Sequence, residues 1–362
     1  MTTIVLTGGG TGGHLFPAIA VAQALRGGER PPRLVFLGPE NRGERATIDA
    51  AGIPFEPVPA APVRGRSPLG LIRSLFTLAR GTIAALARLR RHRPAAVFST
   101  GGYGSFPVSL AAWLLRRPLV VFLPDVAPGL AVRVEKRLAA RIATSTPAAL
   151  NHLPRAKTIV TGYPVRPEFF ALDRAAARAA AGLPDGVPVV VAAGASQGSR
   201  ALNDAVFAGL ETVLEHAILV HVTGQAGLDE ALRRRDSLPA HLAGRYHPAP
   251  FRRDLPAVMV AADLGVFRAG ASILGELPAA ALPSILVPGT FAGAHQRDNA
   301  RWLVEQGAAE LLEESDLALL PGRITALLAD SARLDAMRAA ARALARPAAA
   351  SDIAALLLEV AR

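Results

Sequence analysis

The sequence predicts an α/β protein built from two doubly wound, Rossmann-like domains. Short apolar runs typical of buried strands alternate with helical patterns along most of the chain. Three of these runs lead straight into glycine-rich turns. The chain has 362 residues, more than the roughly 250 to 300 that one hydrophobic core usually serves. We therefore expect two such domains facing each other across a cleft.

The first strand and helix set the pattern of the N-terminal half. Residues 4–6 are an apolar, partly β-branched run, and residues 18–25 repeat apolar side chains at helical spacing, so the glycines between them form a turn. Further strands are expected at 34–37, 55–58, 96–99, 119–123 and 141–144, and helices at 42–51, 69–91, 106–113 and 130–140. Repeated strand–helix units of this kind predict a parallel sheet covered by helices.

The C-terminal half repeats this pattern after a proline-rich passage at 147–167. Strands are expected at 189–193, 218–222, 264–267 and 284–287, and helices at 200–214, 228–235, 254–261, 272–281, 296–306 and from 316 onward. We assign residues 1–160 to an N-terminal domain and residues 161–345 to a C-terminal domain. The last helix, 346–362, is free to return to the N-terminal domain.

The composition indicates a cytoplasmic protein with an ample core, since 51% of its residues are hydrophobic. The best candidate for a membrane span, residues 106–123, is interrupted by Arg116 and Arg117 and so falls short of the roughly 18 apolar residues required. Residues 4–6 lack the preceding basic segment of a signal peptide. The absence of cysteine excludes disulfides and thiolate metal sites.

The net charge of +11 points to an anionic partner, which could be nucleic acid, an acidic lipid surface or a phosphorylated substrate. An arginine-rich genome would produce the same excess without a binding role. Nucleic acid is the least favoured partner, because aromatic residues make up only 5% of the chain and no RNA-binding signature interleaves them with basic residues.

The expected long helix at 69–91 has the composition of an element that lies on a membrane surface. One face would carry Ile72, Leu75, Phe76, Ala79, Ile83 and Leu86. The positive charge would come from Arg64, Arg66, Arg73, Arg80, Arg88, Arg90 and Arg91. Residues 113–117, WLLRR, would extend the same patch. The alternative is an ordinary core-facing stripe with a solvated basic rim.

The glycine turns are candidate anion sites. Glycine allows close approach of a ligand to the backbone, and the following helix directs its free N–H groups and positive end outward. Gly8, Gly10 and Gly13 match G-x-G-x-x-G, with Glu40 just past the second strand, so a dinucleotide site is one possibility. A dinucleotide site uses one such turn, whereas this chain has three in two halves and His14 at the mouth of the first. Tight packing of strand against helix is the other alternative.

Several motifs together resemble the MurG family of glycosyltransferases, glycosyltransferase family 28. They are GGGTGGHLFP (8–17), TGGYGSFP (100–107), GASQGSRALN (194–203), RAGASILGELPAAALPSILVP (268–288) and HQRDNA (295–300), in family order over nearly the whole chain. The resemblance implies a GT-B fold, with the lipid-linked acceptor on the N-terminal domain and the nucleotide sugar chiefly on the C-terminal one, and a role in peptidoglycan synthesis. The implied reaction is an inverting transfer of N-acetylglucosamine from UDP-GlcNAc to the 4-hydroxyl of undecaprenyl-pyrophosphoryl-MurNAc-pentapeptide, on the cytoplasmic face of the anionic cell membrane.

The resemblance also assigns roles to individual residues. His14 would be the general base or would polarise the acceptor hydroxyl, because an imidazole titrates near neutral pH; its alternative role is only to hydrogen-bond the turn or a phosphate. The turn residues Thr11, Gly12 and Gly13 would bind substrate beside it. The donor would contact the N–H groups of Ser196, Gln197 and Gly198, the side chains of Arg166, Glu276, Gln296 and Asn299, and the backbone of Arg252, Ala271, Ser272, Ile273 and Leu274. Glu276 would accept hydrogen bonds from the ribose hydroxyls; its alternative role is to complement the helix dipole.

The chain departs from the family pattern where His-Glu-Gln-Asn usually precedes Pro-Gly-Leu. It reads Phe122, Leu123, Pro124 and Asp125 there, and a carboxylate accepts hydrogen bonds but does not donate them as an amide does. Ala269 replaces a usual serine. No Asp-x-Asp motif is present, and we expect neither metal nor cofactor. A GT-B enzyme with another UDP-sugar or lipid acceptor, a UDP-sugar epimerase and a dinucleotide oxidoreductase remain alternatives.

Overall fold

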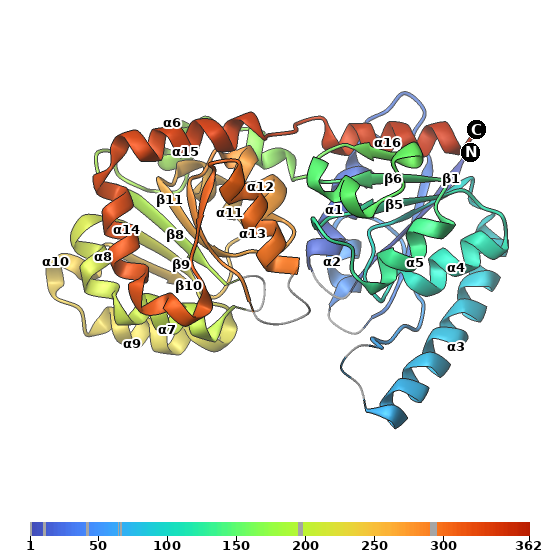
Figure 1. Cartoon of the computed structure of the whole chain (residues 1–362), viewed down its shortest axis with the longest axis horizontal. Coiled ribbons are helices and arrows are strands. Elements are labelled where there is room, and N and C mark those ends of the chain that lie inside the picture. Colours follow the sequence, from blue (N-terminus) through green and yellow to red (C-terminus); the bar gives the residue numbers. More distant parts are fainter. Residues whose placement is uncertain are drawn as a thin grey trace. The chain divides into compact units, whose positions relative to one another are not determined.

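The computed structural model describes residues 2–9, 12–40, 43–63, 65, 67–194, 198–289 and 295–362. The chain divides into two compact units. Unit 1 comprises Met1–Arg166 and Arg346–Arg362, and unit 2 comprises Pro167–Ala345. Each unit is a sheet with helices on both of its faces (Figure 1). Unit 2 is therefore inserted between two segments of unit 1.

The sheet of unit 1 has seven parallel strands among the described residues. In chain order they are β1 (Thr3–Thr7), β2 (Arg33–Gly38), β3 (Phe55–Pro57), β4 (Ala96–Ser99), β5 (Leu119–Leu123), β6 (Arg141–Thr144) and β7 (Thr158–Val160). Their order in space is β3-β2-β1-β4-β5-β6-β7, with Val5 paired to Val35 on one side and to Val97 on the other. The central strands are continuous apolar runs because helices bury both faces of the sheet.

The helices of unit 1 are α1 (Gly12–Arg26), α2 (Glu44–Ala50), α3 (Pro68–His92), α4 (Phe106–Leu114), α5 (Leu130–Leu138) and α16 (Ala349–Val360), with 3₁₀ turns η1 (Pro147–His152) and η2 (Arg155–Lys157). The helix α3 begins at an N-cap, where the Ser67 hydroxyl accepts a hydrogen bond from the Gly70 amide at 3.3 Å. Its Gly81 touches the loop before it, since an added Cβ would lie 1.9 Å from the Pro59 carbonyl oxygen. The helix α16 packs on α1.

The sheet of unit 2 has six parallel strands among the described residues. They are β8 (Val189–Ala193), β9 (Ile218–Val222), β10 (Tyr246–Ala249), β11 (Leu264–Arg268), β12 (Ser284–Val287) and β13 (Ala309–Leu311). Their order is β10-β9-β8-β11-β12-β13. The doubly wound sheets predicted from the sequence are thus confirmed in both halves, with the strand order turning at β1 in unit 1 and at β8 in unit 2.

The helices of unit 2 are η3 (Pro167–Phe170), α6 (Arg174–Ala180), α7 (Arg200–Ala208), α8 (Leu210–His216), η4 (Gln225–Gly227), α9 (Leu228–Asp236), α10 (Ala240–Ala243), α11 (Leu255–Ala261), α12 (Ile273–Ala280), α13 (His295–Glu305), η5 (Glu314–Leu319), α14 (Leu320–Ala329) and α15 (Ser331–Ala343). The single helix predicted at 200–214 is wrong. Its pattern breaks at Gly209, where Pro321 packs so closely that an added Cβ would lie 2.0 Å from the proline Cγ. The chain restarts there as α8.

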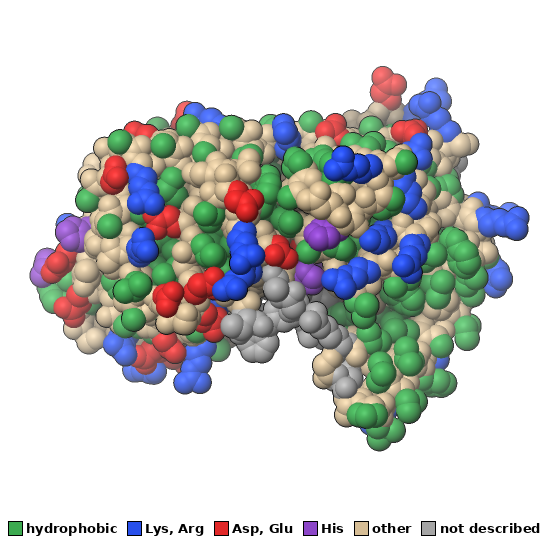
Figure 2. All heavy atoms as spheres, in the orientation of Figure 1, with side chains coloured by type: hydrophobic (Ala, Val, Ile, Leu, Met, Phe, Trp, Pro, Cys, Tyr) green, Lys and Arg blue, Asp and Glu red, His purple; other side chains and the backbone are tan. Residues whose placement is uncertain are grey.

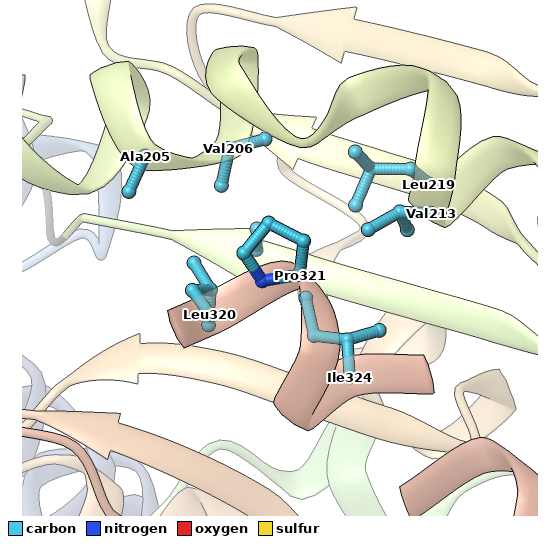
Figure 3. A pocket seen from close by; sticks show the side chains of 8 residues that line it. Ala205, Val206, Val213, Leu219, Leu320, Pro321 and Ile324 are labelled. Carbon is cyan, nitrogen blue, oxygen red and sulfur yellow. The ribbon is translucent and has the colours of Figure 1, made fainter. Parts of the chain in front are cut away.

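A small cavity of about 10 Å³ lies in the core of unit 2, between α14 and the helices α7 and α8. Figure 3 shows Leu320, Pro321 and Ile324 of α14 opposite apolar side chains of the sheet and of α7 and α8. The complete lining is Ala192, Ala205, Val206, Val213, Leu219, Leu320, Pro321 and Ile324. Because no polar side chain lines it, the cavity is a packing gap and offers nothing to orient a ligand.

The structure replaces residues 106–123 with α3 as the candidate for a membrane-spanning segment. Residues 106–123 form α4 and β5, so this candidate is not one helix. Among the described residues, α3 is the one helix with the length and mean hydropathy of a membrane span, and only 22% of its most apolar window is buried. Length and composition alone are weak evidence for spanning, and α3 is amphipathic, with Ser74, Gly81, Thr82, Ala85 and Leu89 facing its own domain.

Candidate active site

Both sheets place their glycine turns at the carboxyl ends of the strands where the order reverses. The turns that begin at Gly8 and Thr100 follow the neighbouring strands β1 and β4, and the turn that begins at Gly194 follows β8, next to β11. Ligands of doubly wound sheets collect at such switch points. Each unit therefore has a candidate ligand site of its own.

His14 lies on the first turn of α1, and its imidazole is held by the second glycine turn. Its Nδ1 lies 2.8 Å from the Thr100 carbonyl oxygen, and the Thr100 hydroxyl donates in return to the His14 carbonyl at 2.7 Å. A carbonyl only accepts hydrogen bonds, so Nδ1 must carry the proton of the neutral ring. The other nitrogen, Nε2, is then left with the lone pair that a general base requires.

Two glycines allow the turns of unit 1 to touch around this histidine. An added Cβ on Gly8 would lie 2.1 Å from the Thr100 hydroxyl oxygen. Gly102 has φ 84°, and an added Cβ there would lie 2.5 Å from the Gly9 carbonyl oxygen and 3.3 Å from His14 Nε2. Tight packing, considered as an alternative role for these turns, is therefore present, and it brings the second turn against the imidazole.

Asp125 and Arg166 lie on loops of the same unit. Asp125 is half-buried in the loop after β5. This loop is pinned by the Ser145 hydroxyl, which donates to the Pro124 carbonyl at 2.8 Å, and by Arg133 Nε, which donates to the Pro128 carbonyl at 3.0 Å. The guanidinium of Arg166 lies over the Phe16 ring of α1, 5.6 Å from its centroid.

The substituted positions before Asp125 belong to the core of unit 1. Phe122 and Leu123 are buried in β5, and the Phe122 ring packs edge-on against Tyr163 with the centroids 5.8 Å apart. The Tyr163 hydroxyl in turn donates to the Gly13 carbonyl at 3.1 Å. The departure from the family pattern therefore supplies packing beneath the first glycine turn.

In unit 2, an arginine that sequence reasoning left without a role ties the glycine turn to its neighbours. Arg268, at the end of β11, donates through Nε to the Ser199 hydroxyl at 2.8 Å and pairs with Glu314. Ser199 caps α7. Gly198 has φ 78° and touches the next loop, since an added Cβ would lie 2.3 Å from the Thr223 carbonyl oxygen. Arg268 could have been found from the sequence, because it is a charged residue at the end of a buried apolar strand.

The two amides expected at the donor sugar also hold loops of unit 2. Asn299 is completely buried, and its Nδ2 donates to the Ala269 carbonyl at 3.1 Å. The Gln296 side-chain oxygen accepts a hydrogen bond from the Gly289 amide at 2.8 Å. These bonds connect α13 to the loops after β11 and β12, so both amides shape the loops around the candidate site.

The remaining donor residues start α12 or precede α11. Ala271 and Ser272 lead into α12, Ile273 and Leu274 are its buried first residues, and Glu276 is half-buried in its first turn. The Arg252 guanidinium binds the Asp254 carboxylate, with Nε 2.9 Å from Oδ1, and this hydrogen bond lowers the pKa of Asp254. The side chain of Arg252 is therefore engaged within unit 2. Gly12 and Gly13 begin α1, whereas Thr11, Ser196 and Gln197 lie outside the described residues.

Elsewhere the described residues show no comparable site. They contain no group of three His, Asp or Glu side chains placed to hold a metal ion. A wide depression of about 500 Å³ lies at the amino ends of β8 and β11, lined by Arg174, Arg178, Asp185 and Asp263 among others. Its arginines donate to backbone carbonyls and to Asp263, so it is a structural ion-pair network on the opposite edge from the glycine turn.

Two switch-point sites with glycine turns, one in each doubly wound unit, are the arrangement of GT-B glycosyltransferases, which use nucleotide-sugar donors. Two family models match this chain. The glycosyltransferase family 28 N-terminal domain covers residues 4–144, and the family's C-terminal domain covers residues 188–354. The chain therefore belongs to glycosyltransferase family 28, and it is a glycosyltransferase.

Individual relatives are similar in sequence to this chain over nearly its full length. An enzyme of Roseiflexus sp. (strain RS-1) named UDP-N-acetylglucosamine–N-acetylmuramyl-(pentapeptide) pyrophosphoryl-undecaprenol N-acetylglucosamine transferase is 41% identical, over 97% of this chain and 93% of its own. An enzyme of the same name from Desulforudis audaxviator is 40% identical, over 97% and 96%.

Solved structures confirm the predicted GT-B fold. The Acinetobacter baumannii MurG crystal structure superposes with a TM-score of 0.76 at 25% identity, covering 99% of this chain and all of the other. A Neisseria meningitidis UDP-GlcNAc 2-epimerase bound to UDP-GlcNAc also superposes, with a TM-score of 0.70, 14% identity and coverage of 99% and 100%. The second likeness shows the fold alone. Membership of family 28 makes the epimerase and oxidoreductase alternatives wrong.

Proposed function

We propose that this protein transfers N-acetylglucosamine from UDP-GlcNAc, with inversion, to the 4-hydroxyl of a MurNAc-pentapeptide carried on pyrophosphoryl-undecaprenol. The names of the relatives at 40–41% identity support the choice of substrates. The observation that carries the chemistry is the hydrogen bond from His14 Nδ1 to the Thr100 carbonyl, because it gives the imidazole the tautomer of a base.

The proposed reaction is a single displacement. The acceptor 4-hydroxyl gives its proton to His14 Nε2 as its oxygen forms a bond to C1 of the donor sugar. The bond from C1 to the β-phosphate oxygen breaks, and UDP leaves with the electron pair. Attack on the face opposite the leaving group inverts C1. The Thr100 carbonyl keeps the ring aligned and stabilises the imidazolium that forms.

The donor half-site of this proposal lies in unit 2. The N–H groups of Ser196, Gln197 and Gly198, together with the positive end of α7, would receive the charge that develops on the pyrophosphate. Glu276 would accept hydrogen bonds from the ribose hydroxyls. The backbone of Arg252 and of Ala271 to Leu274 would contact the nucleotide. Arg268, which donates a hydrogen bond to the N-cap Ser199, would hold the glycine turn that begins at Gly194 next to the end of β11. Arg166 would approach the donor phosphates and Gln296 the sugar, whereas the buried Asn299 would support the loop after β11 through its bond to the Ala269 carbonyl.

The acceptor half-site lies in unit 1, with Thr11, Gly12 and Gly13 beside the base. Asp125 stands where the family has an asparagine that reads the acetamido sugar. A carboxylate there would accept hydrogen bonds from sugar hydroxyls or from the acetamide N–H, so we propose that it reads the sugar through acceptor contacts only.

The same proposal places the protein on the anionic inner face of the cytoplasmic membrane, where its lipid acceptor resides. Of the predicted stripe on α3, Ile72, Leu75, Phe76 and Ile83 are 53 to 68% exposed, so a core-facing stripe is the wrong explanation for these four positions. Leu86 does pack against the core. Figure 2 shows the hydrophobic side chains gathered over α3, and Trp113 and Leu114 of the adjoining α4 are about half exposed. Such a patch with arginines around it favours a peripheral membrane contact.

The function is tested by following N-acetylglucosamine transfer from labelled UDP-GlcNAc to the lipid-linked acceptor. We expect His14→Ala to lower kcat by roughly 10²- to 10⁴-fold, the usual range for loss of a general base. Thermal stabilisation by UDP should persist, at about 2.7 kcal/mol for ligand at 100 times its Kd. The exposed His152 provides a control, since His152→Ala should leave both unchanged. Full turnover by His14→Ala, or stabilisation by NAD and not by UDP, would contradict the proposal.

A further inference from the structure

Glu135 of α5 is a completely buried carboxyl group directly behind the second glycine turn. Its Oε2 lies 3.0 Å from the Ser99 hydroxyl and its Oε1 lies 2.7 Å from the Ser105 hydroxyl, so it touches both ends of the turn. Sequence reasoning missed this residue, which shares the inner face of α5 with Val132 three positions earlier.

Among the described residues, no cation pairs with this carboxyl group. The elements around it are β4, α4 and β5, and their sequences AVFS, FPVSLAAWL and LVVFL contain no ionisable side chain. The turn itself carries only Tyr103. On α5, Arg133 donates to the Pro128 carbonyl, Lys136 donates to the His152 carbonyl, and Arg137 is exposed. Burial without a counter-ion raises the pKa of Glu135.

The contacts of the Ser105 hydroxyl are consistent with a proton on Glu135. The Ser105 hydroxyl has one proton, yet its oxygen lies 2.9 Å from the Gly102 carbonyl and 2.7 Å from Glu135 Oε1. The carbonyl can only accept, so if Ser105 serves it, the contact to Glu135 requires a proton on the carboxyl group. Ser99 completes the chain, because it accepts a hydrogen bond from the Gly101 amide at 3.1 Å and donates to Oε2.

This chain of hydrogen bonds ends on the part of the turn that contacts His14. It fixes the amide of Gly101 and the carbonyl of Gly102. Both of these glycines have positive φ. The residue before them, Thr100, holds His14 Nδ1, and Gly102 lies against His14 Nε2. A shift of the turn would therefore move or cover the imidazole.

We propose that Glu135 is protonated at neutral pH and, through Ser99 and Ser105, positions the glycine turn that orients His14. Glu135 is a positioning residue, since it touches neither substrate nor reacting atoms. The kinetic part of this inference rests on the proposed function.

The first test compares Glu135→Gln with Glu135→Leu. Glutamine reproduces a protonated carboxyl group, with an N–H for Ser105 and an oxygen for Ser99, so we expect kcat within about two-fold of the parent. Leucine fills the space without hydrogen bonds, and we expect kcat to fall about 10- to 100-fold, as small misplacements of catalytic groups do. The KM for UDP-GlcNAc should stay within about two-fold, because the donor half-site lies in unit 2. Glu359→Gln, which neutralises an exposed carboxyl of unit 1, is the control.

The results separate the possible roles. Loss of kcat in Glu135→Gln equal to that in Glu135→Leu would show that the charged form is needed and would overturn the proposal. Unchanged kcat in a folded Glu135→Leu would overturn the positioning role. Should the leucine variant fail to fold, Ser105→Ala removes the hydroxyl through which Glu135 reaches the Gly102 carbonyl, and it must lower kcat for the proposal to stand.

The second test detects the proton on Glu135 directly and does not depend on measuring enzyme activity. Infrared difference spectroscopy of the parent against Glu135→Gln should show the C=O stretch of a protonated carboxyl group at neutral pH, and the parent against Glu359→Gln should not. Absence of this band in the first pair would overturn the proposal. If the parent transferred no N-acetylglucosamine at all, the proposed function would fail while this measurement still decided the state of Glu135.

Discussion

A second buried ionisable side chain, His221 of β9, links the glycine turn of unit 2 to its sheet. Its Nε2 lies 3.1 Å from Asn203 Oδ1 and its Nδ1 lies 2.9 Å from the Tyr246 hydroxyl, while Asn203 donates to the Thr223 carbonyl at 2.9 Å. Asn203 belongs to α7, directly after the turn. This polar network therefore fixes the start of the helix that is to receive the donor phosphates.

Acid should weaken unit 2 through this residue. Burial lowers the pKa of His221 from 6.5 to about 3. Between these values the unfolded chain binds the extra proton, so stability is complete above about pH 6.5 and falls as the pH drops, by about 1.4 kcal/mol for each pH unit. In urea unfolding at pH 4 to 7, His221→Gln should lose part of this slope, and the exposed His216→Gln should keep it. Equal slopes in all three proteins would contradict the assignment.

At the scale of single residues, sequence patterns found side chains whose chemistry is local and missed those whose partners are distant. His14 and the glycines stand next to their turn in the chain. Glu135 acts on Ser99 and Ser105, 36 and 30 positions away, and Arg268 acts on Ser199, 69 positions away. The roles of Asp125, Glu276 and the other substrate contacts stay predictions.

Among the elements, α3 carries the proposed contact with the membrane. Its exposed residues Ile72 and Phe76 lie one turn apart, and its opposite face is pinned to unit 1 through Gly81 and Leu89. We expect Ile72→Glu with Phe76→Glu to reduce flotation with anionic vesicles by at least 10-fold, since full burial of one such side chain is worth about 1.5 to 3 kcal/mol.

A matched control lies in the other unit, where Leu319 is 55% exposed, and Leu319→Glu should leave flotation unchanged. Replacing Arg73 and Arg80 by Gln should weaken binding to anionic vesicles and not to neutral ones, because each basic side chain near the surface contributes about 1 kcal/mol. Parent protein that bound neither vesicle would refute the membrane contact, and equal binding to both would remove its electrostatic part.

Strands with apolar runs were predictable even when short, whereas three short strands without such a run were missed. The strands β7, β10 and β13 have three or four residues each, and β10 contains Pro248. Such segments are strands only because a parallel neighbour pairs with them, as β9 pairs with β10. The break between α7 and α8 likewise depends on Pro321, more than a hundred residues beyond Gly209.

At the scale of the whole molecule, unit 1 is completed by a helix that follows unit 2 in the sequence. The helix α16 buries Ile353 and Leu357 completely and packs on α1 and β4. Where the chain returns, Gly162 with φ 88° meets Arg346, and an added Cβ would lie 2.4 Å from the arginine Cβ. The outgoing and returning segments thus touch within unit 1.

Weakening α16 should therefore destabilise unit 1 alone. Ile353→Ala and Leu357→Ala should each cost about 2 to 5 kcal/mol, as truncation of buried aliphatic side chains does. Hydrogen exchange should then accelerate for amides of β1, β4 and α1, while β8 and β11 keep their protection. Glu359→Ala on the exposed side of α16 is the control. Faster exchange in both units, or in neither, would show that the units are not independent in this respect.

The return of α16 also fixes an order of events during synthesis. All of unit 2 leaves the ribosome before the helix that covers α1 and β4 does. The inserted unit can form its core while it is still tethered, but the first 166 residues wait with the surface around α1 unprotected. We therefore expect the half that carries His14 and the apolar stripe of α3 to mature last; on the proposed function, newly made chains would then pass through a stage in which they bind nucleotide before they can transfer sugar.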